Sequence, residues 1–146
     1  HCNWVRLRDR KSGAEFRVLD IHLDHKSDDA RREQMKMIVG ECAQYADGFP
    51  QIICGDFNSG IENAPVACLR DAGWQEAYEA VHGPGEAGFT YHGFKGPDYR
   101  KKNARRIDFI FVRGNLQPVA AEILRDKVDG LYPSDHYFLM SDFIIQ

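Results

Sequence analysis

The first twenty residues alternate between apolar and polar side chains. The alternation runs from Trp4 to Arg8 and again from Glu15 to Ile21, with turn-forming residues at 11–13 between the two runs. A period of two residues is typical of strands, and a short glycine-containing segment commonly joins antiparallel neighbours. The pattern therefore predicts a β-hairpin at the start of the chain.

The hydrophobic period changes to three or four residues after Asp28. Apolar positions then recur at Met35, Ile38, Cys42 and Tyr45. This spacing places them on one face of an amphipathic helix of about 18 residues. Ser27 or Asp28 can cap its first turn, and Gly48 can end it.

Short apolar runs separated by turn residues predict the remaining elements. Gln51 to Cys54 reads as a strand buried on both faces, and Asn63 begins a second helix that Gly73 ends. Further strands are predicted at Ile107 to Val112, Val119 to Leu124 and Tyr137 to Ile145. The order ββαβαβββ predicts an α/β fold with a mixed, largely antiparallel sheet and helices on one face.

A long segment without regular periodicity, from His82 to Asn103, precedes the last strands. Its one strand-like part is Phe89 to His92. Structureless segments of this length are either flexible linkers or functional loops. The aromatic and basic side chains of this segment favour a functional loop, because such residues are typical of contact surfaces.

Length and composition limit the possible classes of protein. The 146 residues, of which 43% are hydrophobic, fit one domain with an ordinary core, and the net charge of −3 leaves only local contacts to nucleic acid. The four cysteines form no C-x-x-C pair or tight disulfide framework. No apolar stretch approaches the ~20 residues that span a bilayer. The compartment stays open, with the cytoplasm slightly favoured.

Two polar side chains follow the predicted strand at Gln51 to Cys54. Asp56 and Asn58 flank Phe57. On an extended backbone, residues i and i+2 point to the same side, so a carboxylate and an amide could together hold a water or a divalent ion. The alternative is a turn in which one of them bonds its own backbone.

An aspartate inside an apolar strand predicts a partner for its charge. Asp108 lies in such a strand, where a carboxylate is costly unless it is paired. An imidazole is a natural partner, so we predict a dyad of Asp108 with His136. The alternative is an outward-facing Asp108 bound to Arg105 or Arg106.

The neighbouring residues Asp135 and His136 cannot face the same way on a strand. We therefore expect Asp135 to bind a metal ion, and His136 to contact the scissile phosphate or the attacking water. His22, at the end of the second predicted strand, can point into the same rim as Asn58. It would act as a hydrogen-bond donor or proton source.

A basic loop precedes the Asp108 strand. It contains Lys95, Arg100, Lys101, Lys102, Arg105 and Arg106, interleaved with Phe94 and Tyr99. Such a loop can seat several phosphates or a nucleic-acid backbone, and we take Arg100, Lys101, Lys102 and Arg105 as substrate-binding candidates. The alternative is a solvated loop without a ligand.

Four ordered segments carry a resemblance to a known family. These are a strand ending in His22, then Gly55-Asp56-Phe57-Asn58, Arg106-Ile107-Asp108 and Ser134-Asp135-His136. Together they resemble the endonuclease/exonuclease/phosphatase superfamily of metal-dependent phosphoesterases. The resemblance implies hydrolysis of a phosphate ester by a phosphodiesterase, nuclease or phosphatase that uses Mg²⁺ or Mn²⁺.

The resemblance also implies roles for individual residues. Asp56 would position or activate the nucleophilic water with Asn58 beside it. His136 would contact the phosphate with Asp108 behind it. Asp135 would help to bind magnesium, with Asp56 and Asn58 as further candidate ligands, and His22 would assist the phosphate or the leaving group.

The chain also departs from the family pattern. Family members carry an amino-terminal half with an asparagine and a metal-binding glutamate, and nothing before His22 offers either. The chain would then be a single domain, residues 1–146, equivalent to the carboxyl-terminal half of a four-layer α/β sandwich. Its exposed apolar sheet face would need a cover, either a missing amino-terminal half, which we favour, or a second copy. The alternative function is a catalytically inactive half-domain that serves as a binding or assembly module.

Overall fold

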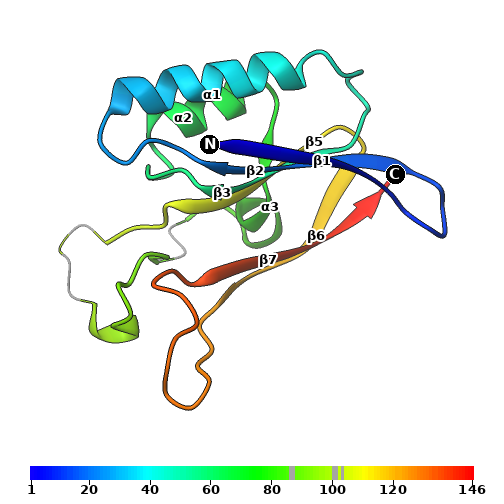
Figure 1. Cartoon of the computed structure of the whole chain (residues 1–146). Coiled ribbons are helices and arrows are strands. Elements are labelled where there is room, and N and C mark those ends of the chain that lie inside the picture. The colour runs from blue at the N-terminus through cyan, green and yellow to red at the C-terminus, as the bar shows by residue number, and fades with distance from the viewer. Residues whose placement is uncertain (86–87, 100–101, 103) are drawn as a thin grey trace.

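The computed structural model describes residues 1–85, 88–99, 102 and 104–146. A five-stranded sheet forms its centre, in the order β1-β2-β3-β5-β4, and a separate two-stranded sheet lies across from it (Figure 1). The strands of the larger sheet are β1 Cys2–Arg8, β2 Glu15–His22, β3 Gln51–Asp56, β4 Gln75–Glu76 and β5 Asp108–Arg113.

The larger sheet is mixed but mostly antiparallel. Strands β2 and β3 run parallel, whereas the β1–β2, β3–β5 and β4–β5 pairs are antiparallel. The predicted hairpin is β1–β2, and its turn is held by Asp9, whose carboxylate accepts the backbone N–H of Ser12 at 2.6 Å. The fold class predicted from the sequence is therefore confirmed.

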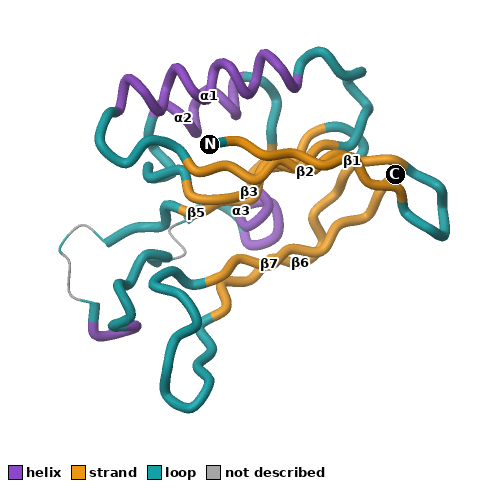
Figure 2. The backbone as a smooth tube through the Cα atoms, viewed as in Figure 1, coloured by secondary structure: helices purple, strands orange, loops and turns teal. Residues whose placement is uncertain are grey.

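Two helices, α1 Asp28–Cys42 and α2 Ala64–Asp71, cover one face of this sheet (Figure 2). Ser27 caps α1 as predicted, because its hydroxyl accepts the N–H of Ala30 at 3.2 Å. The helix is shorter than predicted and ends before Tyr45. The ring of Tyr45 instead packs over the buried guanidinium of Arg17, 4.7 Å away.

The core lies between this sheet face and the two helices. Alternate residues of the strands point into it, and they include Leu19, Ile21, Ile53, Phe109 and Phe111, all at most 2% exposed. The apolar positions of α1 that the sequence placed on one face complete this cluster. Because only one strand register buries these side chains, the core also fixes which polar residues end up at the strand ends.

The last two strands, β6 Leu116–Leu124 and β7 Phe138–Ile145, pair only with each other in the described part of the chain. They cross below the sheet face opposite to α1 and α2 (Figure 1). A gap of about 500 Å³ separates the two layers near Cys54, Ile110 and Leu139. The sequence pattern predicted these strands but did not separate them from the larger sheet.

A third helix, α3 Ala77–His82, packs between β5 and β6. The sequence did not predict it, because six residues are too few to establish a helical period. A short 3-10 helix at Gly96–Asp98 follows in the long loop. None of the helices in the described residues combines the length and apolar character needed to cross a membrane.

A buried ion pair joins α3 to the start of β5. Arg106 donates to the two carboxylate oxygens of Glu76 at 3.1 and 3.2 Å, and the side chains are only 2% and 1% exposed. The guanidinium also lies 4.7 Å from the centre of the Phe109 ring, and Glu76 accepts the N–H of Glu79 in the first turn of α3. The pair thus fixes both α3 and the segment that leads to Asp108.

We expect Glu76→Ala to lower the free energy of unfolding by about 3–5 kcal/mol, because it leaves the buried Arg106 charge without a partner. Urea denaturation measures the change. The matched control is Asp47→Ala, which breaks a pair with Arg113 in which Asp47 is 97% exposed and should have little effect. Equal losses in the two variants would contradict this account of the pair.

Candidate active site

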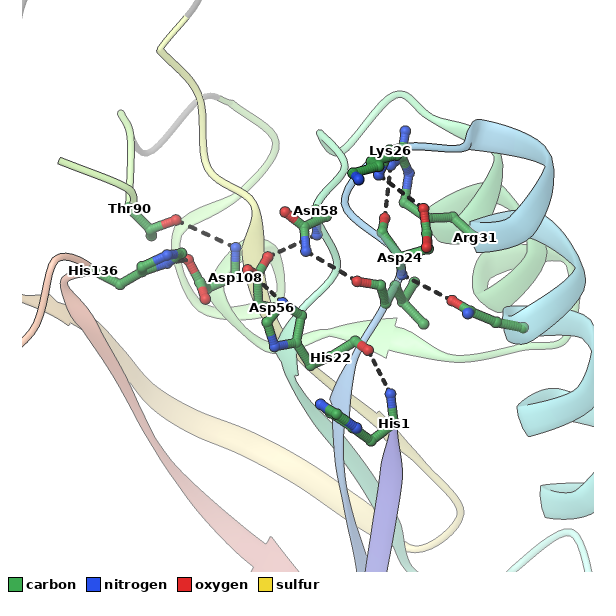
Figure 3. A network of polar contacts seen from close by, with 12 residues as sticks. His1, His22, Asp24, Lys26, Arg31, Asp56, Asn58, Thr90, Asp108 and His136 are labelled. Carbon is green, nitrogen blue, oxygen red and sulfur yellow. Dashed lines mark hydrogen bonds and ion pairs between the residues drawn. The ribbon is translucent and has the colours of Figure 1, made fainter. Parts of the chain in front are cut away.

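Two carboxylates face each other at adjacent strand ends. Asp56 is the last residue of β3 and Asp108 is the first residue of β5, and the antiparallel register pairs them directly. His136, just before β7, joins them, so that ligand-type atoms of the three residues all lie within 4.8 Å of one another (Figure 3). Residues distant in the sequence therefore meet at one edge of the sheet.

The predicted contact between Asp108 and His136 is confirmed. His136 Nδ1 lies 2.8 Å from Asp108 Oδ2. The hydrogen bond to Asp108 is the main reason why the pKa of His136 is raised, and burial of the ring acts in the opposite direction. With Nδ1 directed at a carboxylate, Nε2 is the nitrogen left to face a ligand. The alternative partner Arg106 is bound to Glu76 instead, and the ion pair described for the Asp108 carboxylate is the one with His136.

Asp56 and Asn58 form a tight turn rather than a continuing strand. Asn58 has a positive φ of 48°, and its N–H donates to Asp56 Oδ1 at 2.7 Å. The backbone turn that the sequence left open as an alternative is thus present, and the extended geometry assumed for Asn58 is wrong. Phe57 between them points into the core as predicted and is fully buried.

The side chains of Asn58 and Asp56 contact different neighbours of the turn. Asn58 Nδ2 donates to the carbonyl of Leu23 at 3.0 Å, which leaves its side-chain oxygen free of that bond. Asp56 Oδ2 lies 3.6 Å from His22 Nε2. Burial raises the pKa of Asp56, the N–H of Asn58 lowers it, and the nearby Asp108 raises it further.

A glycine makes the approach to this turn possible. Gly55 has φ 132°, and a Cβ atom there would lie 2.0 Å from the carbonyl oxygen of Ile21 on β2. No other residue fits between the two strands at this distance. Gly55 therefore lets β2 and β3 run close enough together for His22 and Asp56 to share the rim.

His22 lies where the sequence predicted. It ends β2, pairs in register with Asp56, and points to the same rim (Figure 3). Its side chain is 56% exposed, and its carbonyl accepts a hydrogen bond from the amino group of His1 at 2.8 Å. An exposed imidazole beside a half-buried carboxylate can reach a ligand in the open part of the site.

The carboxylate of Asp135 is not part of the cluster formed by Asp56, Asp108 and His136. Its backbone carbonyl accepts the N–H groups of His92 and Gly93 at 2.8 and 3.1 Å, which docks the long loop onto this segment. Its role as a metal ligand stays a prediction.

The basic loop is only partly described. Arg100 and Lys101 lie outside the described residues, and Lys102 is exposed. Arg105 packs over the turn after Asn58. The Cδ atom of Arg105 lies 2.7 Å from the position that a Cβ atom on Gly60 would occupy. Arg106 was wrongly grouped with these residues, since its guanidinium is buried against Glu76 and is not available to a substrate.

The sequence did not assign a role to Thr90 or Tyr91, both of which contact the site. The Thr90 hydroxyl accepts the backbone N–H groups of Ile107 and Asp108. Tyr91 forms an isolated antiparallel bridge with His136, and their ring centres are 5.1 Å apart. The available signal was the strand-like segment Phe89 to His92 within an irregular stretch.

Comparisons with known structures agree with this fold. A protein of unknown function from Enterococcus faecalis V583 is 26% identical with a TM-score of 0.85, and the match covers 99% of this chain and 56% of that one. Mannosyl-6-phosphatase from Bacteroides thetaiotaomicron VPI-5482 is 23% identical with a TM-score of 0.83, covering 98% of this chain and 56% of that one.

A more distant structure, D. rerio TDP2 complexed with a single-strand DNA product, is 18% identical with a TM-score of 0.74, covering 98% of this chain and 62% of that one. The chain thus spans somewhat more than half the length of these structures. No curated protein matches the sequence.

A family model extends the comparison from structure to sequence. The model described as the Endonuclease/Exonuclease/phosphatase family matches residues 3–136, which include every residue of the cluster. The chain therefore belongs to the endonuclease/exonuclease/phosphatase family.

Proposed function

We propose that the protein hydrolyses a phosphate ester by attack of water on phosphorus. The observation that carries the proposal is the 2.8 Å bond between His136 and Asp108 within reach of Asp56. An acid–base pair beside a second carboxylate is a set of groups that can move protons and stabilise charge on a phosphate. Among the similar structures, one is named a phosphatase and another holds a DNA product, which supports the same reaction class.

Each residue of the cluster has a separate role in this proposal. Asp56, with Asn58 beside it, orients the attacking water and accepts its proton. Its raised pKa places it closer to neutral pH than an ordinary aspartate, which suits a group that takes up a proton. His136 donates from Nε2 to a phosphate oxygen while Asp108 holds the ring. His22 assists the phosphate or the leaving group from the exposed side.

We further propose that the site uses magnesium, with manganese as the alternative. The carboxylate of Asp56 and the amide oxygen of Asn58 are ligand types that suit a hard cation. Mg²⁺ is commonly held by one or two carboxylates together with substrate phosphates. Asp135 is the third predicted ligand. When bound, such an ion would neutralise the negative charge that develops on the phosphate oxygens.

The substrate proposed here carries several negative charges and includes nucleic acid as a candidate. Arg105 supports this proposal, because its side chain lies over the turn that immediately follows Asn58. Arg100, Lys101 and Lys102 would extend the positive surface. Because the chain has a net charge of −3, a polyanionic substrate would be recognised by these local basic groups rather than attracted by the charge of the whole surface.

Additional polypeptide is proposed to cover the gap between the two sheets. Its lining includes the apolar side chains of Ile110, Phe138 and Leu139, and Phe138 is 50% exposed. Burying apolar surface stabilises a protein by about 25 cal/mol per Å². A further segment of the same protein or a second copy would provide this cover, and native mass spectrometry distinguishes them.

We expect His136→Ala to lower the hydrolysis rate of a bis-aryl phosphodiester in the presence of magnesium by about 10²–10⁴-fold, because it removes the group that donates to the phosphate. His82→Ala is the matched control, since this exposed imidazole bonds the Ala121 carbonyl and is not part of the cluster. EDTA should abolish turnover of the wild type.

Turnover that resists the chelator, or full activity of His136→Ala, would contradict the proposal. A folded wild type without activity on any phosphate ester would favour the binding or assembly module instead. The observation that favours this alternative is that the carboxylate of Asp135, an expected metal ligand, is not one of the clustered groups.

The pH dependence of the pair gives an independent test. Asp108 raises the pKa of His136, so the pair stabilises the fold fully below the ordinary histidine pKa of about 6.5 and loses this contribution as the pH rises through the folded value. Asp108→Asn should lower the His136 pKa measured by NMR titration. It should also weaken the loss of stability with rising pH, whereas Asp47→Asn should leave the titration of His136 unchanged. A His136 pKa that does not move in Asp108→Asn would show that the bond is not formed in solution.

The basic residues predict an effect on substrate binding. Replacing Arg100, Lys101 and Lys102 together by alanine should raise KM for a polyanionic substrate and leave a small ester nearly unaffected. Gly60→Ala should act in the same direction, because its Cβ displaces the flexible end of Arg105 without removing the charge. Equal changes for both substrates would exclude these residues from substrate recognition.

A further inference from the structure

Thr90 contacts the segments that carry both members of the Asp108–His136 pair. It is completely buried, and its hydroxyl oxygen accepts the N–H groups of Ile107 and Asp108 at 3.1 and 3.3 Å. The bond to Asp108 is drawn in Figure 3. Its backbone carbonyl accepts the N–H of Tyr137 at 2.9 Å. One residue is therefore bound on one side to the start of β5 and on the other to the residue after His136.

The two sides of this connection differ in kind. Toward His136 the contact is made by the main chain, since Tyr91 bridges His136 and the N–H of His92 donates to the Asp135 carbonyl at 2.8 Å. Toward Asp108 the described hydrogen bonds of Thr90 are both made by its hydroxyl. A change of side chain at this position can therefore release Asp108 while it leaves the contacts to His136 in place.

We propose that Thr90 is a positioning residue whose hydroxyl sets the separation between Asp108 and His136. This inference rests on the proposed hydrolysis at that pair. Without the hydroxyl, two partly buried N–H groups at the start of β5 lose their acceptor, and the strand end must move to find another. A shift of that kind turns the imidazole ring of His136 away from the phosphate without removing any group that touches the substrate.

The test uses two variants, one that keeps the shape of the side chain and one that keeps its hydroxyl. Thr90→Val keeps the shape but has no acceptor, whereas Thr90→Ser keeps the acceptor. Thr90→Val should abolish the hydrogen-exchange protection of the Ile107 and Asp108 amides and lower kcat by about 10- to 100-fold, with KM changed less than about threefold. Thr90→Ser should retain both the protection and most of kcat, a rescue that a role in packing alone would not produce.

Ser141→Ala is the matched control. It also removes a hydroxyl bonded to the backbone, here the 2.6 Å bond to the Ala120 carbonyl, but this bond lies within the β6–β7 ladder. It should leave kcat and the two amides unchanged. If Thr90→Val does not fold, the temperature coefficients of the Ile107 and Asp108 amides in the wild type replace it, and values typical of solvent-exposed amides would overturn the inference.

The remaining outcomes separate the two proposals. Unchanged kcat in Thr90→Val despite lost protection would overturn the positioning role and leave the hydrolysis intact. Equal losses in Thr90→Ser would show that the hydroxyl is not the group that acts. Absence of turnover in the wild type would overturn the proposed function, and the positioning role with it, whatever the amides show.

Discussion

The pairing of β3 with β5 is the constraint on which the site depends. This register places Ile53, Phe109 and Phe111 on the helix-covered face, where they are fully buried. A slip of one residue would turn these side chains to the other face and lose about 1.5–3 kcal/mol for each. The same register sets Asp56 opposite Asp108. The apolar core thus determines the position of two carboxylates that contribute nothing to it.

Carboxylates directly opposite each other on neighbouring strands repel, so this arrangement lowers stability unless a positive group is nearby. His136 provides that charge when it is protonated, and its pKa is raised mainly by the hydrogen bond to Asp108, with a smaller contribution from Asp56. A local conflict of this kind, retained at the rim of a well-packed sheet, is typical of functional sites. The structural ion pair of Arg106 with Glu76, by contrast, is closed to solvent and to substrate.

The sequence predicted those parts of the site that follow from pattern and from the cost of burying charge. Asp108 stood alone in an apolar strand, so its need for a partner could be inferred, and order along the chain made His136 the candidate. The sequence offered the turn at Asn58 only as an alternative to an extended backbone, because Asn and Asp side chains are found in both settings and local pattern does not choose between them. For Thr90 the only signal was its place in the strand-like segment Phe89 to His92, since a hydroxyl that accepts backbone N–H groups produces no periodic pattern in the sequence.

Because the two sheets form separate layers, the long loop at residues 82–103 is important for the geometry of the site. His136 precedes β7, which belongs to the smaller sheet, whereas Asp56 and Asp108 belong to the larger one. The segment around Thr90 and Tyr91 makes hydrogen bonds with residues on both sides of that division. The Asp108–His136 hydrogen bond therefore joins the two layers, and a movement of the smaller sheet toward or away from the larger one would change the separation of these two residues. A cover over the apolar gap would restrict that movement, so a segment that buries this apolar surface would also fix the geometry of the pair.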